Sequence, residues 1–329
     1  MKRIVLFVGL LIIFLSVWQE ESQAPLVLPQ QETEEEQATL LFVGDIMLDR
    51  GIEYYIQKNG GDWRFPFLNI ADFLKKADLV FGNLESVISD KGTKQGSIYS
   101  FRADPRSLEG LTFAEFDVLS VTNNHSLDYG MEALLDSISR VESQGIATLG
   151  AGINKEAAQK LFIKEIQGTK IGMLAYTNTG SPLWEVGDTT FGVSWVDEHN
   201  LAEFSQRIED AKKEVDILVV SIHFGEEYQK EPSITQELIA KTAIGSGADI
   251  IVGHHPHVVQ PLVQYQASLP AGRQGWIAYS LGNFIFDQGF SKETTQGLLL
   301  EVIVQDKKIT KVSPRPIHLN SQSQPSLSK

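Results

Sequence analysis

The chain has 329 residues, which is enough for one large domain or two smaller ones, and 42% of them are hydrophobic, so a sizeable core can form. It carries 42 acidic and 28 basic residues, a net charge of −14, which argues against nucleic acid as a partner because such binding depends on Lys and Arg contacts with phosphates. The same charge opposes an anionic polymer unless a metal ion and a few local arginines override it. The absence of cysteine excludes disulfides, thiolate metal sites and a lipoprotein anchor.

The first 18 residues predict an export or anchoring segment. Lys2 and Arg3 precede an apolar run over residues 4–18, which is the pattern of a signal sequence. This run would reach about 22 Å as a helix, less than the roughly 30 Å of a hydrocarbon core, but Trp18 at the interface could extend it. No good cleavage site follows. We therefore expect an uncleaved anchor in the cell membrane with the rest of the chain outside; secretion after cleavage is the alternative.

One folded domain is expected over residues 39–319. A tract rich in Gln, Glu and Pro over residues 19–38 predicts a disordered linker, and the polar residues 320–329 predict a disordered tail. Apolar runs predict buried strands over residues 40–43, 77–81, 117–121, 145–150, 216–222 and 250–252. Helices are expected over residues 66–76, 107–115, 131–144, 198–214 and 235–246. Paired strands are expected over residues 161–166 with 170–176, 258–266 with 275–280, and 296–305 with 309–317.

Ligand-type side chains follow five of these strands. In chain order they are Asp45, then Asn83 and Glu85, then Asn124 and His125, then His223, and finally His255 and His257. Open α/β sheets place their sites at the carboxyl ends of strands, so we expect these side chains to meet at one edge. A single Asp after a strand is often a helix cap instead, but five such strand ends in one chain are hard to explain by packing.

Three of the seven histidines lie within four positions, at 254, 255 and 257. They follow the apolar run 250–252, and Pro256 stiffens the loop between them. Imidazole is a common ligand for zinc-like and iron-like ions. The alternative is a surface loop with incidental histidines.

Carboxylate, amide and imidazole together suit one or two divalent ions of the Mn, Zn or Fe type. Two such ions would polarise a phosphoryl or carbonyl oxygen and ionise a water. The Asn124 amide could fill a coordination position without adding charge, and His125 beside it could give a proton to the leaving group.

The order of motifs resembles a known family. Gly-Asp, Asn-Leu-Glu, Asn-Asn-His, His-x-Gly-Glu, Gly-His-His-Pro-His and Ser-Leu-Gly-Asn-Phe follow one another over residues 40–304. This arrangement is similar to the bacterial capsule-synthesis proteins tied to poly-γ-glutamate, a branch of the calcineurin-like metallophosphoesterases. The resemblance implies an α/β fold, a four-layer α-β-β-α sandwich with metals at the strand ends.

The resemblance also implies roles for individual residues. The implied metal ligands are Asp45, Glu85, Asn124, His223, His255 and His257. His125 resembles the catalytic histidine. Glu85, or alternatively Asn83, stands at the position of the family's bridging carboxylate.

A second group of residues is expected to support the site. It consists of Asn83, His254, Asp49 and Asp128, with Arg102 and Asn283 as candidate substrate contacts or, equally, structural residues. One departure from the family pattern concerns the first motif, where Met47 replaces the histidine of Asp-x-His and is a poor ligand for a hard ion. Asp49 could substitute for it, or it could start a helix.

The resulting hypothesis is an extracytoplasmic, metal-dependent hydrolase-like protein in the synthesis, export or processing of an anionic capsule polymer such as poly-γ-glutamate. It would act on a phosphoester or a γ-glutamyl amide. One alternative is a non-catalytic, metal-containing scaffold or polymer-binding subunit of a membrane capsule-synthesis complex. Another is a secreted phosphodiesterase unrelated to capsule.

Overall fold

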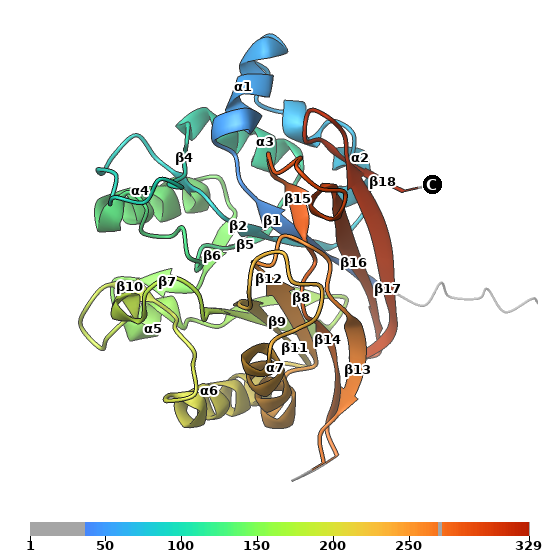
Figure 1. Cartoon of the computed structure of the whole chain (residues 1–329). Helices are drawn as coiled ribbons and strands as arrows, with labels where there is room; N and C mark the ends of the chain where they lie inside the picture. Colours follow the sequence, from blue (N-terminus) through green and yellow to red (C-terminus); the bar gives the residue numbers. More distant parts are fainter. Residues whose placement is uncertain (1–36, 269–271, 329) are drawn as a thin grey trace, which may run out of the picture. The chain divides into compact units, whose positions relative to one another are not determined.

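Two β-sheets packed face to face, with helices on both outer faces, make up the computed structural model, which describes residues 37–268 and 272–328 (Figure 1). The predicted anchor over residues 1–18 and most of the predicted linker over residues 19–38 lie outside the described residues. No helix within the described ranges is long and apolar enough to cross a membrane. The folded domain begins one residue earlier than predicted, at Ala38.

The first sheet is mixed. Its strands, in spatial order, are β18 (Pro325–Leu327), β17 (Lys308–Leu319), β16 (Gln296–Gln305), β1 (Ala38–Ile46), β2 (Leu79–Leu84), β5 (Val118–Ser120) and β6 (Ala147–Leu149). β1, β2, β5 and β6 run parallel, whereas β16 to β18 are antiparallel. A short strand, β15 (Asn283–Ile285), also pairs in parallel with the end of β1.

The second sheet has a parallel centre and antiparallel edges. Its strands are β13 (Leu262–Gln266), β14 (Gln274–Ala278), β12 (Ile250–His254), β11 (Ile217–His223), β9 (Thr169–Thr177) and β8 (Phe162–Ile166). Two small ribbons complete the strands: β3 (Val87–Ile88) with β4 (Arg102–Ala103), and β7 (Ala151–Gly152) with β10 (Gly192–Val193). The described α-helices are α1 (Arg50–Lys58), α2 (Ala71–Leu74), α3 (Leu108–Phe113), α4 (Gly130–Ser143), α5 (Lys155–Ala158), α6 (Leu201–Glu214) and α7 (Ile234–Ser246).

Both sheets are buried on both faces, which explains why their central strands are continuous apolar runs. Along β1, Leu40 and Phe42 point into the core between the sheets, while Leu41 and Val43 point into the core beneath α1 to α4. β11 alternates in the same way between the inter-sheet core and the core beneath α6 and α7. The predicted four-layer α-β-β-α sandwich is confirmed.

The helices of the first outer layer differ from the prediction. The sequence pattern gave no helix over residues 50–58, where α1 lies, and it predicted one continuous helix over 66–76. In the structure that stretch is a 3-10 turn, η1 (Phe65–Phe67), followed by the short α2. Phe67 and Ile70 are both buried against the first sheet, so packing overrides the local helix preference.

The expected disordered tail over residues 320–329 is wrong for its described part. β18 adds to the edge of the first sheet by pairing antiparallel with β17. Gln324 is buried, and its Nε2 donates to the carbonyl oxygen of Phe65 at 2.6 Å, while its Oε1 accepts from Asn320 Nδ2 at 3.0 Å. Backbone pairing and one buried amide therefore anchor a segment whose polar composition gives no hint of order.

Gln324→Ala should lower the free energy of unfolding by about 1–2 kcal/mol, because the buried Phe65 carbonyl loses its close amide donor and keeps only the longer bond from the Leu68 N–H at 3.4 Å. Urea denaturation at pH 7 measures the change. The exposed Ser321→Ala on the same turn is the matched control and should leave stability unchanged. Equal midpoints for the two variants would mean that the tail contributes nothing to folding.

Candidate metal centre

Strand ends from both sheets meet at one place. Asp45 at the end of β1 is in register with Asn83 of β2 and with Asn283 of β15. In the second sheet, His223 at the end of β11 is in register with His254 of β12. The predicted convergence of ligand-type side chains follows from this pairing, because parallel neighbours end at the same edge.

The glycines before these residues permit close backbone approach. A Cβ on Gly44 would lie 1.8 Å from the carbonyl oxygen of Gly282, and one on Gly253 would lie 2.0 Å from that of Tyr279. No larger residue fits at either position without moving a strand. Gly44 and Gly253 thereby bring Asp45 and His254 to the junction.

Two overlapping groups of buried side chains have the geometry to hold metal ions. Glu85, His255 and His257 form one group, and Asp45, Glu85 and His223 form the other; within each, one ligand atom per residue lies within 4.8 Å of the others. Glu85 belongs to both groups. Its carboxylate could therefore bridge two ions or serve a single one.

The Glu85 carboxylate is the clearest sign that a cation belongs here. Its Oε1 is buried without a hydrogen-bond partner. That oxygen lies 3.6 Å from His257 Nε2, 3.8 Å from His125 Nε2 and 3.9 Å from His223 Nε2. His255 Nδ1 is also buried and unpartnered. A divalent ion bound by these oxygen and nitrogen atoms would satisfy them, so the residues present fit a metal of the Mn, Zn or Fe type.

Burial sets the charge states of the site. Burial, with the charges of Asp45 and Glu227 adding to it, raises the pKa of Glu85 well above its usual value. Burial and the neighbouring His257 lower the pKa of His255 to about 3, and burial with His255 lowers that of His223 well below its usual value. Both imidazoles are therefore neutral at pH 7 and keep a lone pair for a metal.

Asp45 remains ionised in spite of its burial. Burial alone would raise its pKa, but the imidazoles of His254 and His257, at 3.3 and 3.4 Å from its carboxylate oxygens, hold the pKa well below the usual value. The backbone N–H of His255 also donates to Oδ2 at 3.2 Å.

Amide side chains connect the two sheets at the site. Asn83 Nδ2 donates to Asp45 Oδ1 at 2.8 Å and lies 3.2 Å from His223 Nδ1. Asn124 Oδ1 lies 2.9 Å from His223 Nε2. Asn123, which the sequence analysis did not single out, donates to the Leu84 carbonyl at 2.9 Å and accepts from the His125 backbone N–H at 3.0 Å. These bonds fix the loop that carries Asn124 and His125.

The histidine loop is held in a conformation that costs free energy. His255 has φ of 97° and His257 has φ of 58°, in a region where side chains other than Gly are uncommon. Such strain is typical of functional sites. His257 is further fixed because its Nδ1 lies 3.0 Å from Asn283 Oδ1.

His125 stands at the edge of the ligand groups and faces open space. Its Nδ1 lies 2.7 Å from Asp128 Oδ2, so Asp128 orients the ring and favours a proton on Nδ1. Asp128 Oδ2 also accepts from the Phe101 backbone N–H at 2.8 Å, and the Phe101 ring packs against His125 with centroids 4.0 Å apart.

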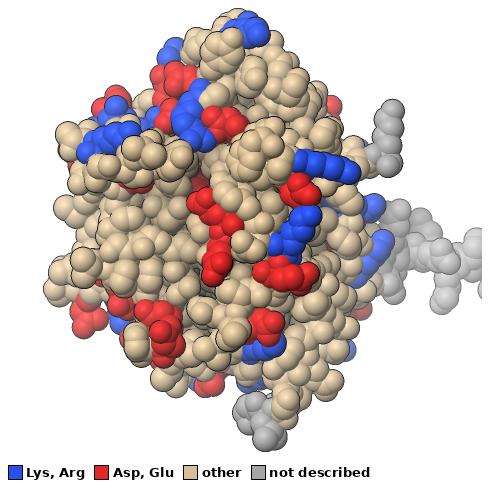
Figure 2. All heavy atoms as spheres, viewed as in Figure 1, with Lys and Arg blue, Asp and Glu red and all other residues tan. Residues whose placement is uncertain are grey.

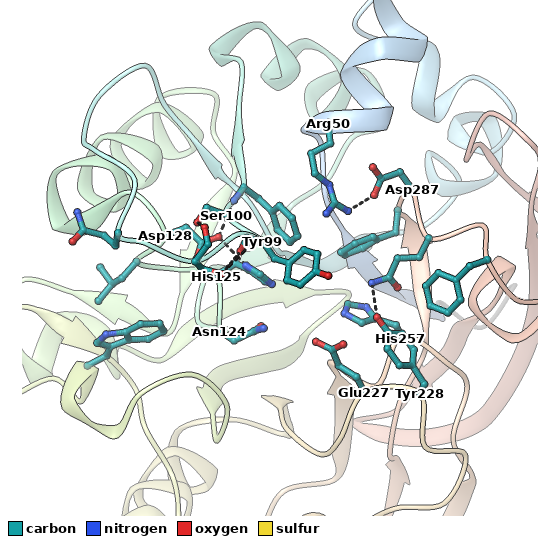
Figure 3. Close-up of a pocket in the computed structure, with 18 residues that line it drawn as sticks. Arg50, Tyr99, Ser100, Asn124, His125, Asp128, Glu227, Tyr228, His257 and Asp287 are labelled. Carbon is teal, nitrogen blue, oxygen red and sulfur yellow. Dashed lines mark hydrogen bonds and ion pairs between the residues drawn. The ribbon is translucent and has the colours of Figure 1, made fainter.

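A pocket of about 760 Å³ opens over the site (Figure 3). Asn124, His125 and His257 reach it from the ligand side. Most of its other walls are aromatic or acidic. They include Tyr99, Phe101, Trp184, Tyr228, Phe286, Phe290, Asp128, Glu227 and Asp287, with Arg50.

Some residues singled out from the sequence have structural contacts instead. Asp49 caps α1 by accepting from the Arg50 N–H and also accepts from the Arg102 N–H at 2.8 Å, so the helix-start alternative is what the structure has. The Arg102 guanidinium lies over the Tyr129 ring and donates to the carbonyl oxygens of Lys91 and Gly92, away from the pocket lining.

Three further residues lie outside both ligand groups and the pocket lining. Met47 is buried in the outer core of the first sheet, where its sulfur accepts from the Asp49 N–H. Asn283 is fully buried beside His257 and donates to the Thr294 carbonyl at 3.0 Å. His254 is buried with neither ring nitrogen hydrogen-bonded.

Sequence reasoning missed the pocket residues Arg50, Glu227 and Asp287. Each follows a predicted strand end by a few positions: Arg50 after Asp45, Glu227 within the His-x-Gly-Glu-Glu stretch that begins at His223, and Asp287 after the Asn-Phe pair at 283–284. A charged residue a few positions after a predicted ligand could therefore have been predicted to line the pocket.

Sequence comparison places the chain among capsule proteins. A family model described as "Bacterial capsule synthesis protein PGA_cap" matches residues 39–288. The "Capsule biosynthesis protein CapA" of Bacillus anthracis is 31% identical over 317 residues, covering 95% of this chain and 74% of the relative. The "PGA biosynthesis protein CapA" of Bacillus subtilis (strain 168) is 31% identical over 291 residues, covering 88% and 73%.

Comparison with solved structures supports the fold alone. A hypothetical protein from Thermus thermophilus superposes with a TM-score of 0.52 at 18% identity, covering 84% of this chain and 98% of that one. The NAD nucleotidase NadN of Haemophilus influenzae gives 0.51 at 14% identity, covering 89% and 60%. These neighbours share the α/β fold of this chain.

Metal content should separate the two ligand groups. Glu85→Gln should abolish stable binding of Mn²⁺ or Zn²⁺, because both groups lose a ligand. His223→Ala should weaken metal binding at least about tenfold in the group that contains Asp45, and His255→Ala should do the same in the group that contains His257. Elemental analysis after metal loading and gel filtration measures this, with the exposed His199→Ala as control. Unchanged metal content in Glu85→Gln would exclude this site.

On the alkaline side of neutrality, where His223 and His255 are neutral in both the folded and the unfolded chain, the metal-free protein should be less stable as pH rises. The pKa of Glu85 is higher in the folded protein than in the unfolded chain. The contribution of protonated Glu85 to the free energy of unfolding is therefore fully present below the unfolded pKa and is lost as pH rises through the folded pKa. Glu85→Gln should therefore raise the melting temperature of the metal-free protein at pH 8 and flatten its pH dependence. Thermal unfolding in chelator checks this; a variant less stable than wild type would contradict it.

Proposed function

The chain belongs to the bacterial capsule synthesis protein family PGA_cap, and from this premise we propose that it is an extracytoplasmic, metal-dependent hydrolase acting on an anionic capsule polymer of the poly-γ-glutamate type. Its role in capsule synthesis follows from family membership. The hydrolytic activity, the substrate bond and the location are the proposal.

One observation carries the hydrolase assignment. The unpartnered carboxylate oxygen of Glu85, shared by two ligand groups, lies 3.8 Å from His125 Nε2, and His125 lines the pocket. The ligand groups thus lie beside a proton-transferring side chain, and His125 and His257 open onto one substrate-sized cavity. That combination is typical of metal-assisted hydrolysis.

When bound, divalent metal would polarise the scissile carbonyl or phosphoryl group and lower the pKa of a water molecule. His125 transfers the proton. Because Asp128 holds the Nδ1 proton, the free Nε2 is directed toward the ligand groups, where it can accept a proton from the attacking water and then give that proton to the leaving amine or alcohol. The rings of Phe101 and Phe286 pack against His125 and His257, respectively, and limit the access of bulk water.

The outward location rests on the N-terminal sequence. Lys2 and Arg3 followed by the apolar run over residues 4–18 support a membrane anchor with its basic end inside. A polymer being exported would then meet the pocket on the outer side.

A specific observation favours a second candidate, a metal-containing polymer-binding subunit without catalysis. Met47, two residues after Asp45, is buried in the outer core instead of facing the site. The first motif thus supplies one ligand, which leaves a smaller ligand set than two catalytic ions ordinarily have.

His125→Ala should distinguish catalysis from binding. Turnover of γ-glutamyl anilides or aryl phosphoesters by Mn²⁺- or Zn²⁺-loaded protein should fall by about 10²–10⁴-fold, while metal content stays the same. His199→Ala, an exposed histidine substitution, is the control and should retain full activity. The readouts are initial rates together with elemental analysis.

Capsule formation in cells provides the deciding outcome. A chromosomal His125→Ala strain should lose capsule polymer or make polymer of altered length. If purified wild type shows no turnover and the His125→Ala strain makes normal capsule, the hydrolase proposal is wrong and the binding subunit is supported.

A further inference from the structure

The pocket over the metal centre has an unfavourable charge for an anionic substrate. Its described lining contains three carboxylates, Asp128, Glu227 and Asp287, and a single Lys or Arg side chain, Arg50. Figure 2 also shows Asp and Glu side chains over the middle of the face that Figure 1 presents. An acidic wall repels an acidic ligand. A negatively charged group entering this pocket therefore meets one complementary side chain besides the metal centre.

Arg50 is held rigidly in the pocket wall. It is the first residue of α1 and has φ of 50°, an uncommon conformation for a side chain other than Gly. Its guanidinium pairs with one carboxylate oxygen of Asp287, and the other oxygen of Asp287 accepts from the Gly51 N–H at 3.0 Å. The guanidinium carbon also lies 4.4 Å from the centre of the Phe101 ring. Two contacts, with Asp287 and with Phe101, thus fix a long side chain that would otherwise lose entropy on binding, and the Gly51 N–H holds Asp287 in place.

Single aromatic rings separate Arg50 from the site histidines. Phe101, beneath the guanidinium, packs against His125 with centroids 4.0 Å apart. Phe286 lies 6.0 Å from the guanidinium carbon and 4.7 Å from the His257 ring. Figure 3 shows Arg50 pointing into the cavity from the top of the view, with its ion pair to Asp287. A substrate group on Arg50 is therefore next to the reacting centre.

Arg50 retains hydrogen-bonding capacity for a ligand. Guanidinium has five N–H donors, and in the structure one terminal nitrogen contacts Asp287. The side chain is one-third exposed. The planar fork matches a carboxylate in bidentate geometry, and the pairing with Asp287 aligns it in advance.

We infer that Arg50 is the substrate-positioning residue of the pocket and binds the α-carboxylate of a γ-glutamyl unit whose γ-amide lies at the metal centre. The inference rests on the proposed function. In poly-γ-glutamate the amide runs through the side chain, so each unit keeps a free α-carboxylate that is separated from its γ-amide by the α-carbon and two methylene groups. The aromatic walls accommodate the methylene groups of that unit. With a single cation in the described lining, the pocket selects one carboxylate near the reacting amide.

Binding of a defined oligomer tests the inference without requiring turnover. The full-length chain in detergent, loaded with Mn²⁺, is titrated calorimetrically with tri-γ-glutamate and with a 4-aminobutyrate trimer, which has the same backbone without α-carboxylates. Wild type should bind tri-γ-glutamate more tightly. Arg50→Ala should weaken that binding by about 10- to 100-fold and leave binding of the uncharged-backbone trimer unchanged.

Two further variants control for charge and folding. Arg50→Lys keeps the charge but loses the fork, so binding should be intermediate. Arg106→Ala is the matched control, because Arg106 also pairs with an aspartate, Asp104, and lies over an aromatic ring, Trp63, but outside the pocket. It should bind as wild type does. Thermal melting shows whether each variant is folded.

The outcomes separate the two proposals. If Arg50→Ala binds tri-γ-glutamate as wild type does, or if wild type does not prefer it over the 4-aminobutyrate trimer, the Arg50 assignment is overturned, whatever the activity. If binding depends on Arg50 but no γ-glutamyl substrate is turned over, the assignment stands and the hydrolase proposal fails. Turnover with a raised KM and a preserved kcat in Arg50→Ala supports both.

Discussion

The carboxylate of Glu85 lies buried where the carboxyl ends of the two sheets meet, with one oxygen facing three imidazole rings and no hydrogen-bond donor. A buried carboxylate with an unpartnered oxygen is among the more expensive features a fold can contain. The other oxygen accepts from Asn83 Nδ2 at 3.3 Å, but Asp45 and Glu227 add negative charge nearby. A divalent cation bound by the two ligand groups would offset that cost.

The rest of the fold brings groups together around that carboxylate. The sheets pack through alternate residues of each strand, so the inter-sheet core fixes β1 and β2 against β11 and β12. Without this packing, Asp45 and Glu85 from one sheet would not lie near His223 and His257 from the other. The loop after β12 then places the His255 and His257 side chains at the site. Both residues have positive φ, which costs free energy in backbone strain. Two glycines with no room for a Cβ, Gly44 and Gly253, allow the final approach.

The pocket shows how an acidic protein can address an acidic ligand. The overall charge of −14 gives no local attraction, and most of the charged lining is also acidic. For an anionic ligand, attraction would come from a bound metal ion and from Arg50, which Asp287 and Phe101 hold in place. Confining positive charge in this way favours a ligand whose negative group has a fixed relation to the bond at the metal centre. The pocket would then select a ligand by where its negative group lies relative to that bond, and not by general electrostatic attraction.

The sequence by itself predicted the buried strands and the strand ends that carry ligands, because buried central strands read as unbroken apolar runs and parallel strands end at one edge; the four-layer sandwich was what the resemblance to the capsule-synthesis family implied. Asp45, Glu85, His223, His255 and His257 were all identifiable in this way. Local pattern could not determine α1, the ordered tail with Gln324, or the capping role of Asp49, since each depends on contacts with residues distant in the chain. Only the tertiary structure decided that Met47 and Arg102 face away from the pocket and that Arg50 enters it. Side-chain direction at an irregular strand-to-helix junction is set by packing against other elements, and spacing along the chain does not encode it.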